Sequence, residues 1–251
     1  MFIISIWITF AIFFGIYVTK MFNLWLVLIA WTTGLSIYLL IKNKLPSEKY
    51  IILSITLAAI ASAAYLGYAF KFYLQIPITF VNCLLASLAV FSVMEKYGEY
   101  DLIKTDKKSS TLISVLIGIA VGVGLGLINL LLAKGSSMKV DFAITLPRII
   151  VSLNPGINEE ISSRAIFMAF FVYKFTAQNK APTKIQRFSM WFMMTVPHCY
   201  AHGYPFFDSL ILLVLFGLPF AFLQRKRDLT SAMLSHALVD LIRFVVVGLP
   251  V

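Results

Sequence analysis

The chain has 251 residues, of which 60% are hydrophobic and 13% are charged, and its mean hydropathy is +0.90. Soluble domains hold roughly 45–50% apolar and about 25% charged residues, so this composition excludes a soluble globular protein and indicates a polytopic membrane protein. The net charge of +10 does not indicate a nucleic-acid partner. The basic residues lie in short loops between apolar runs, as orientation in a lipid bilayer requires.

Long apolar runs recur along the whole chain, and a helix needs about 20 such residues to cross a bilayer. We predict an all-α transmembrane bundle of about 8–9 spanning helices. The predicted spans are 2–19, 23–41, 50–70, 77–94, 111–133, 157–176, 187–202, 206–223 and 229–248. The first run has no basic segment before it and no small-residue cleavage site, so we expect a retained span instead of a signal peptide.

Residues 142–156 form a short apolar stretch that Pro147 and Arg148 interrupt. We expect a re-entrant or interfacial segment there, buried against protein wherever it enters the bilayer. If it spanned instead, the orientation of everything after it would invert.

The loops that follow even-numbered spans are the more basic ones. They contain Lys42, Lys44, Lys49, Lys96, Lys104, Lys107, Lys108, Lys180, Lys184, Arg187, Arg225, Lys226 and Arg227, against Lys20, Lys71, Lys134, Lys139 and Arg148 in the odd loops. Basic loops stay in the cytoplasm, so we predict a cytoplasmic N-terminus in an integral protein of a prokaryotic plasma membrane.

The fifth span carries a small residue at every fourth position, namely Gly118, Gly122 and Gly126. Such a stripe predicts the close approach of a neighbouring helix. No lysine and Ser/Thr follow it in the pattern of a phosphate-binding loop, so we assign it a packing role.

Ionisable side chains concentrate in the last third of the chain, inside or beside apolar spans. They are Glu159, Glu160, Arg164, His198, His202, His236 and Asp240. Each such group at the centre of a bilayer costs on the order of 2.5–3.5 kcal/mol, so we expect them to converge on one polar cavity.

The sequence "NPGINEEISSR" places Glu160 and Arg164 four residues apart, on one face of a helix, where the arginine can neutralise the carboxylate. Glu159 points about 100° away and lacks that partner, which suits a general base. The structural alternative is that both glutamates merely occupy the first turn of a helix that begins after Pro155 and Gly156, with Asn158 as its cap.

His198 and His202 also share a helix face, beside the bend that Pro197 should cause, and Gly203 and Pro205 should end that helix. Such a pair could hold a transition metal, although the zinc-protease motif HExxH is absent. Packing within the bundle is the alternative role.

His236 and Asp240 lie one turn apart on the last span. Asp240 could serve His236 only as a structural partner, or it could pair with Arg243.

Together these segments resemble the CAAX-protease and bacteriocin-processing (Abi) family of intramembrane proteases. The matches are Glu159, Glu160 and Arg164 to its EExxxR motif, His202 to FxxxH, and His236 with Asp240 to HxxxD. His198 departs from the family by standing at the usual aromatic position. The resemblance covers about residues 142–251, so we divide the single membrane domain 1–251 into accessory helices (1–141) and a catalytic core (142–251).

The resemblance implies an intramembrane endopeptidase that hydrolyses a peptide or a membrane-tethered protein. Glu159 would activate a water with help from His202, and His236 with Asp240 would bind that water or the oxyanion, while Glu160 and Arg164 support the site. No cofactor is required in this mechanism. A divalent metal such as Zn remains an alternative, with Glu159, His198, His202 and His236 as candidate ligands.

Two other functions stay open at this point. The same fold could bind a peptide or a partner membrane protein without catalysis, as in bacteriocin self-immunity, or it could relay protons in a transporter. Against a transporter, the two halves of the chain hold no matching pair of interrupted helices. Counting residues from the cytoplasmic charges at about 1.5 Å each places Glu160 and His202 in the outer half of the membrane.

Overall fold

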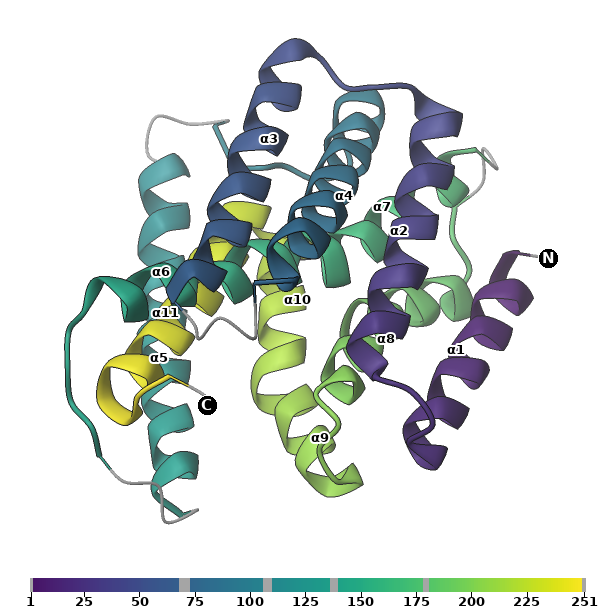
Figure 1. Cartoon of the computed structure of the whole chain (residues 1–251). Helices are drawn as coiled ribbons and strands as arrows, with labels where there is room; N and C mark the ends of the chain where they lie inside the picture. The colour runs from purple at the N-terminus through teal and green to yellow at the C-terminus, as the bar shows by residue number, and fades with distance from the viewer. Residues whose placement is uncertain (1, 68–72, 106–109, 136–139, 178–180, 250–251) are drawn as a thin grey trace.

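The computed structural model describes residues 2–67, 73–105, 110–135, 140–177 and 181–249. The predicted charges Lys71, Lys107, Lys108, Lys139 and Lys180 lie outside these residues. The elements are α1 (Phe2–Thr19), α2 (Leu24–Asn43), α3 (Glu48–Ala63), the 3-10 turn η1 (Ala64–Gly67), α4 (Gln75–Tyr97), α5 (Ser110–Gly135), α6 (Leu146–Asn154), the π-helical η3 (Pro155–Ala165), α7 (Ile166–Thr176), α8 (Lys184–Ala201), α9 (Phe206–Leu212), the π-helical η4 (Leu213–Gly217), α10 (Leu218–Lys226) and α11 (Leu229–Val247). The described residues contain no strand, which confirms the all-α prediction (Figure 1).

Seven helices within the described ranges are long and apolar enough to cross a membrane. They are Phe2–Thr19, Leu24–Asn43, Glu48–Leu66, Gln75–Tyr97, Ser110–Ala133, Phe206–Lys226 and Leu229–Val247. The two other predicted spans, 157–176 and 187–202, fall in the η3–α7 segment and in α8. The chain is therefore an integral membrane protein with a helical bundle.

The segment with the two glutamates does not begin a helix, so the expected turn at Pro155 and cap at Asn158 were wrong. The helix begins after Thr145, with Pro147 in its first turn, and continues through α6, η3 and α7 to Thr176. Asn158 instead accepts a hydrogen bond from the Ser162 hydroxyl at 3.0 Å. Because Pro155 has no backbone N–H to close an α-helical bond, the wider π-helical turn carries the chain past it.

This long helix forms the centre of the bundle. All residues of α7 from Ile166 to Val172 are buried, as expected of a helix that is apolar on every side. It passes between α2, α3 and α4 on one side and α8 and α11 on the other (Figure 1). Gly156 permits the contact with α11, because a Cβ there would lie 2.6 Å from the Cβ of Ala237. The central helix thereby presents its polar π-helical segment to α8 and α11.

The glycine stripe of α5 contacts α11, which confirms its predicted packing role. A Cβ on Gly118 would meet Ser231 and Leu234, one on Gly122 would meet Ser235 and Leu238, and one on Gly126 would meet Ile242. The partner positions advance with the stripe, so α5 and α11 run parallel. This close approach fixes the depth at which the polar residues of α11 enter the bundle.

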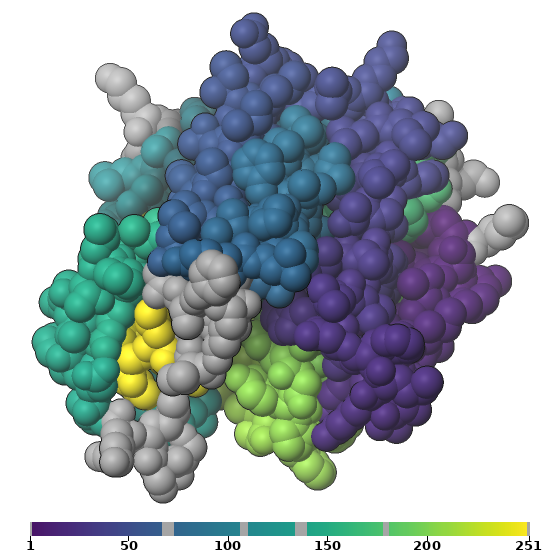
Figure 2. Space-filling model, viewed as in Figure 1, coloured from purple at the N-terminus to yellow at the C-terminus, as the bar shows by residue number. Residues whose placement is uncertain are grey.

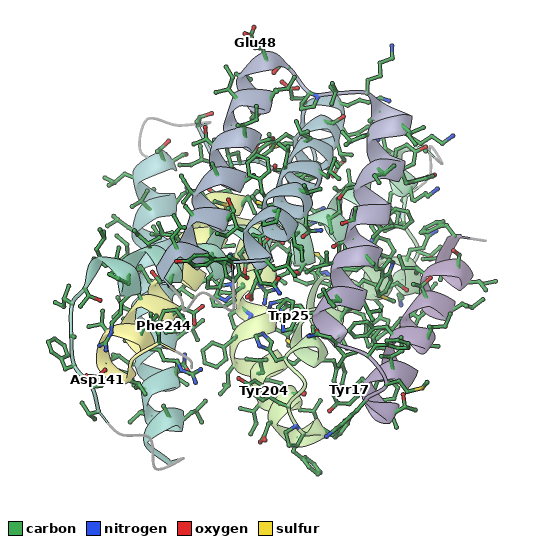
Figure 3. The ribbon with its side chains drawn as sticks, viewed as in Figure 1. Tyr17, Trp25, Glu48, Asp141, Tyr204 and Phe244 are labelled. Carbon is green, nitrogen blue, oxygen red and sulfur yellow. The ribbon has the colours of Figure 1, made fainter. Side chains whose placement is uncertain are left out.

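The two ends of the bundle differ in charge. At one end, hydrogen bonds join α4 and the loop after it to the loop after α2 and to the end of α10: the Ser47 backbone N–H donates to Glu95 at 2.7 Å, and Arg225 donates to the Glu99 carbonyl at 3.0 Å. We call this the basic end, since it carries Lys42, Lys44, Lys49, Lys96, Lys104, Arg225, Lys226 and Arg227. At the other end Tyr17 donates to the Tyr204 carbonyl at 2.8 Å, and Figure 3 shows these residues far from Glu48 of the basic end.

Candidate functional site

A cavity of about 490 Å³ lies inside the bundle, and every ionisable residue predicted for the site except Glu160 lines it. These lining residues are Glu159, Arg164, His198, His202, His236 and Asp240. They come from η3, from α8 and its C-cap, and from α11. Glu160 is fully buried behind them. The three segments therefore bring their polar side chains together, as the cost of isolated charges in a membrane requires.

The deepest part of the site is an ion pair between Arg164 and Glu160. Both side chains are almost fully buried, at 1% and 0% exposure, and an Arg164 Nη1–H donates to Glu160 Oε1. The same oxygen accepts from Nδ1 of His236 at 2.6 Å, and Gln224 donates to the Glu160 backbone carbonyl at 3.1 Å. This cluster ties the π-helical segment to α10 and α11.

His198 connects this cluster to Glu159. Its Nδ1 lies 2.9 Å from Arg164 Nη2, and its Nε2 lies 2.6 Å from Glu159 Oε2. An arginine can only donate, so Nδ1 must accept and the ring proton must sit on Nε2. His198 therefore donates to Glu159 and holds one oxygen of its carboxylate in place.

The remaining residues surround Glu159 at longer range. Nε2 of His236 lies 3.8 Å from Glu159 Oε2 and 3.5 Å from Asp240 Oδ2, and the His236 ring stacks on Phe220 at 4.5 Å between centroids. Both alternatives for Asp240 can now be compared. It approaches His236, whereas the described residues contain no ion pair between it and Arg243.

His202 lies one turn beyond His198, where Gly203 ends the helix in a left-handed conformation at φ 71°. Its ring stacks on Tyr204 at 5.6 Å and meets the edge of Trp25 at 5.1 Å between centroids. Figure 3 shows Trp25 and Tyr204 in the half of the bundle away from the basic end. His202 therefore lies in the part of the cavity wall that is farther from the basic end.

Glu159, His198 and His202 each offer one ligand atom within 4.8 Å of the others, which is a spacing that a metal ion could use. The donor chemistry does not fit, however. Because Arg164 occupies the lone pair on Nδ1 of His198, the proton on Nε2 would have to leave before Nε2 could bind a metal, and the ring would become an imidazolate. His198 is therefore a hydrogen-bond donor in this arrangement and a poor metal ligand.

The N-terminal helices also contribute to the cavity, which the sequence did not reveal. Trp25 of α2, Thr79 and Asn82 of α4 and Asn129 of α5 line it. The available signal was the presence of asparagines within apolar spans, since a polar side chain in a membrane needs a partner or a cavity. Phe220 and Gln224 of α10 were missed as well, because Phe220 is an ordinary apolar residue and Gln224 lies just after the predicted span 206–223.

The exposed lining residues Asn23 and Tyr204 mark the mouth of the cavity. They lie in the loops after α1 and α8, and Figure 2 shows the yellow-green surface of α9 beside the purple surface of α1 and α2 in this region. The mouth is therefore at the end of the bundle opposite the basic end.

Comparisons with known proteins matched one part of the chain. Residues 141–242 match the family model for type II CAAX prenyl endopeptidase Rce1-like proteins. Searches of curated proteins and of solved structures each gave no match. The matched range contains all three segments that supply the ionisable residues of the cavity. Residues 141–242, about two fifths of the chain, are therefore similar to the Rce1-like family of CAAX proteases.

Proposed function

We propose that this protein is an intramembrane endopeptidase in which Glu159 activates the hydrolytic water. The observation that supports this is a carboxylate in the wall of a cavity, beside His198, His202 and His236 from two other segments of the bundle. The similarity of residues 141–242 to a CAAX endopeptidase family supports a protease that acts on a membrane-associated peptide or protein.

Glu159 has one oxygen held and one available. Oε2 accepts from His198, whereas Oε1 makes no hydrogen bond within the described residues. In the proposed reaction Glu159 takes a proton from water, the water oxygen bonds to the peptide carbonyl carbon, and the C–N bond then breaks. The proton passes from Glu159 to the leaving amine, so the carboxylate is restored.

The other residues have distinct proposed roles. His202 assists Glu159 in orienting the water, and His236 with Asp240 binds the water or the developing oxyanion, since preorganised polar groups stabilise that charge. Glu160 and Arg164 are positioning residues. Arg164 fixes His198, which fixes Glu159, and Glu160 fixes His236.

We propose the glutamate mechanism without a metal, because of the donor role that Arg164 imposes on His198. The check is metal analysis of the purified protein together with dialysis against a chelator. Retained activity and sub-stoichiometric metal support the proposal, whereas activity that is lost with the chelator and restored by Zn would refute it.

The substrate is proposed to be a peptide or a membrane-tethered protein that enters from the side opposite the basic end. If the basic loops face the cytoplasm, as the sequence predicts, the mouth opens on the outer side of a prokaryotic plasma membrane. The bilayer itself brings an apolar, tethered substrate to the mouth.

Glu159→Gln tests the function directly. It keeps the shape and one acceptor oxygen for the His198 N–H but cannot take a proton, so we expect a loss of about 10²–10⁴-fold in cleavage rate with little change in thermal stability. His202→Ala should lower the rate in the same assay. Asp208→Asn is the matched control, because Asp208 is an exposed carboxylate in the first turn of α9.

Full activity in both Glu159→Gln and His202→Ala would refute the protease. If those variants still bound peptide or still protected cells from a bacteriocin, the non-catalytic binding function would replace it.

A further inference from the structure

A second cavity lies at the basic end of the bundle, apart from the candidate site of Glu159. Its volume is about 630 Å³, and its wall is formed by the end of α7, the start of α8, the end of α10 and the loop after α4. Among the described residues, none lines both cavities. The reaction proposed above therefore does not account for this second cavity.

Cations outnumber anions in the wall of the second cavity. Its ionisable lining residues are Glu99, Arg187, Arg225 and Lys226. Arg225 is paired with Glu99, because their side chains approach to 3.9 Å and the guanidinium also donates to the Glu99 carbonyl at 3.0 Å. Arg187 of α8 and Lys226 of α10 have no side-chain hydrogen bond or ion pair in the described part of the chain. The cavity thus holds two uncompensated positive charges from two helices, which favours an anionic ligand.

The wall becomes apolar one turn further from the basic end. On α8, Arg187 and Trp191 are four residues apart and share a helix face, with Trp191 on the side of the membrane centre. On α7, Thr176 and Val172 have the same relation. Cations at the end of the bundle and apolar side chains below them match a molecule with an anionic head and an apolar tail. A free phosphate ion would use only the first of these two layers.

We propose that this cavity binds the headgroup of an anionic phospholipid. Arg187 and Lys226 hold the phosphate, and the half-buried ring of Trp191 packs against the first carbons of the acyl chains. The arginine fork can make two charge-assisted hydrogen bonds to one phosphate, and the lysine adds a point charge. Basic pockets between membrane helices, on the side of the basic loops, are suited to such headgroups, and tryptophan is enriched at this depth of a bilayer.

A lipid in this position would connect the helices that carry the candidate active site. It bridges Arg187 at the start of α8 and Lys226 at the end of α10, beside the end of α7. The same α8 carries His198, and α7 continues from the π-helical segment with Glu159. Because the lipid binds the packed ends of three helices, it stabilises the folded bundle over the unfolded chain. Thermal stability therefore reports its binding without any measurement of cleavage.

The test is thermal unfolding of the full chain in detergent micelles that contain either phosphatidylglycerol or phosphatidylcholine. At a phosphatidylglycerol concentration about 100 times its Kd, we expect Tm to rise by about 5–10 °C, with little rise in phosphatidylcholine. Native mass spectrometry should show one retained phosphatidylglycerol per chain. The double variant Arg187→Gln/Lys226→Gln should lose both effects and still fold, since both side chains are exposed. Lys49→Gln is the matched control, because it removes an exposed cation from the same end outside the cavity.

Three results would overturn the proposal. The first is an equal rise in Tm with the two lipids in the wild type. The second is a phosphatidylglycerol effect that persists in the double variant, because the lipid would then bind elsewhere. The third is an equal rise with inorganic phosphate or glycerol 3-phosphate, because the ligand would then be a soluble anion. None of these results depends on cleavage, so they are separate from the outcome for Glu159→Gln.

Discussion

Removal of the buried Arg164 charge should destabilise the protein more than removal of an exposed charge does. In Arg164→Met, Glu160 would remain fully buried with His236 as its one side-chain partner, and His198 would lose the donor to its Nδ1. Breaking one side of a buried ion pair costs about 3–5 kcal/mol, because an uncompensated charge is left behind. For a chain of this size that corresponds to a decrease in Tm of about 6–20 °C.

The assay is thermal unfolding of the purified protein in a single detergent. Arg187→Met serves as the control, since Arg187 is exposed at the start of α8 and should change the stability by no more than about 0.5 kcal/mol. The double variant Arg164→Met/Glu160→Gln removes both charges, so it should be more stable than the sum of the single effects by about 0.5–3 kcal/mol. Two results would refute the claim that Glu160 needs Arg164 as a counter-ion. One is a free energy of unfolding of Arg164→Met within about 1 kcal/mol of the wild type. The other is strict additivity of the two single effects in the double variant.

Three further predictions follow from individual contacts. His198→Gln should retain about ten-fold more cleavage activity than His198→Leu, because the amide can accept from Arg164 and donate to Glu159; equal rates would show that this hydrogen-bond chain is unimportant. Gly122→Ala should destabilise the protein by about 1–3 kcal/mol in thermal unfolding, since its Cβ would lie 2.8 Å from the Leu238 Cβ, whereas Gly124→Ala, which meets nothing within 4 Å, should not. In intact cells a membrane-impermeant thiol reagent should label Tyr204→Cys and leave Glu48→Cys unlabelled, because the mouth and the basic end face opposite sides; the reverse pattern would invert the proposed orientation. The native Cys83 and Cys199 are buried and provide a low background.

Some features of the site followed from the sequence because they depend on local spacing. Glu160 and Arg164 pair at four residues as expected, and His236 approaches Asp240 at the same spacing. The convergence of the three segments was also predictable, since charges in apolar helices need a common polar environment. Which histidine contacts Glu159 directly was not predictable. The family motif implies a role for His202, and the structure places His198 in hydrogen-bond contact with the carboxylate.

The sequence by itself determined the class of protein and most of the helices, because apolar runs of spanning length allow little else in a bilayer. It also determined which residue types would form the site. Tertiary structure decided the rest: that Pro155 is crossed by a π-helical turn inside a continuous helix, and that helices of the N-terminal half supply Trp25 and Asn129 to the cavity. It also placed Arg243 of α11 in the wall of that cavity. These outcomes depend on how helices distant in sequence pack against one another, and glycine contacts such as those of Gly122 and Gly156 set the separation of those helices.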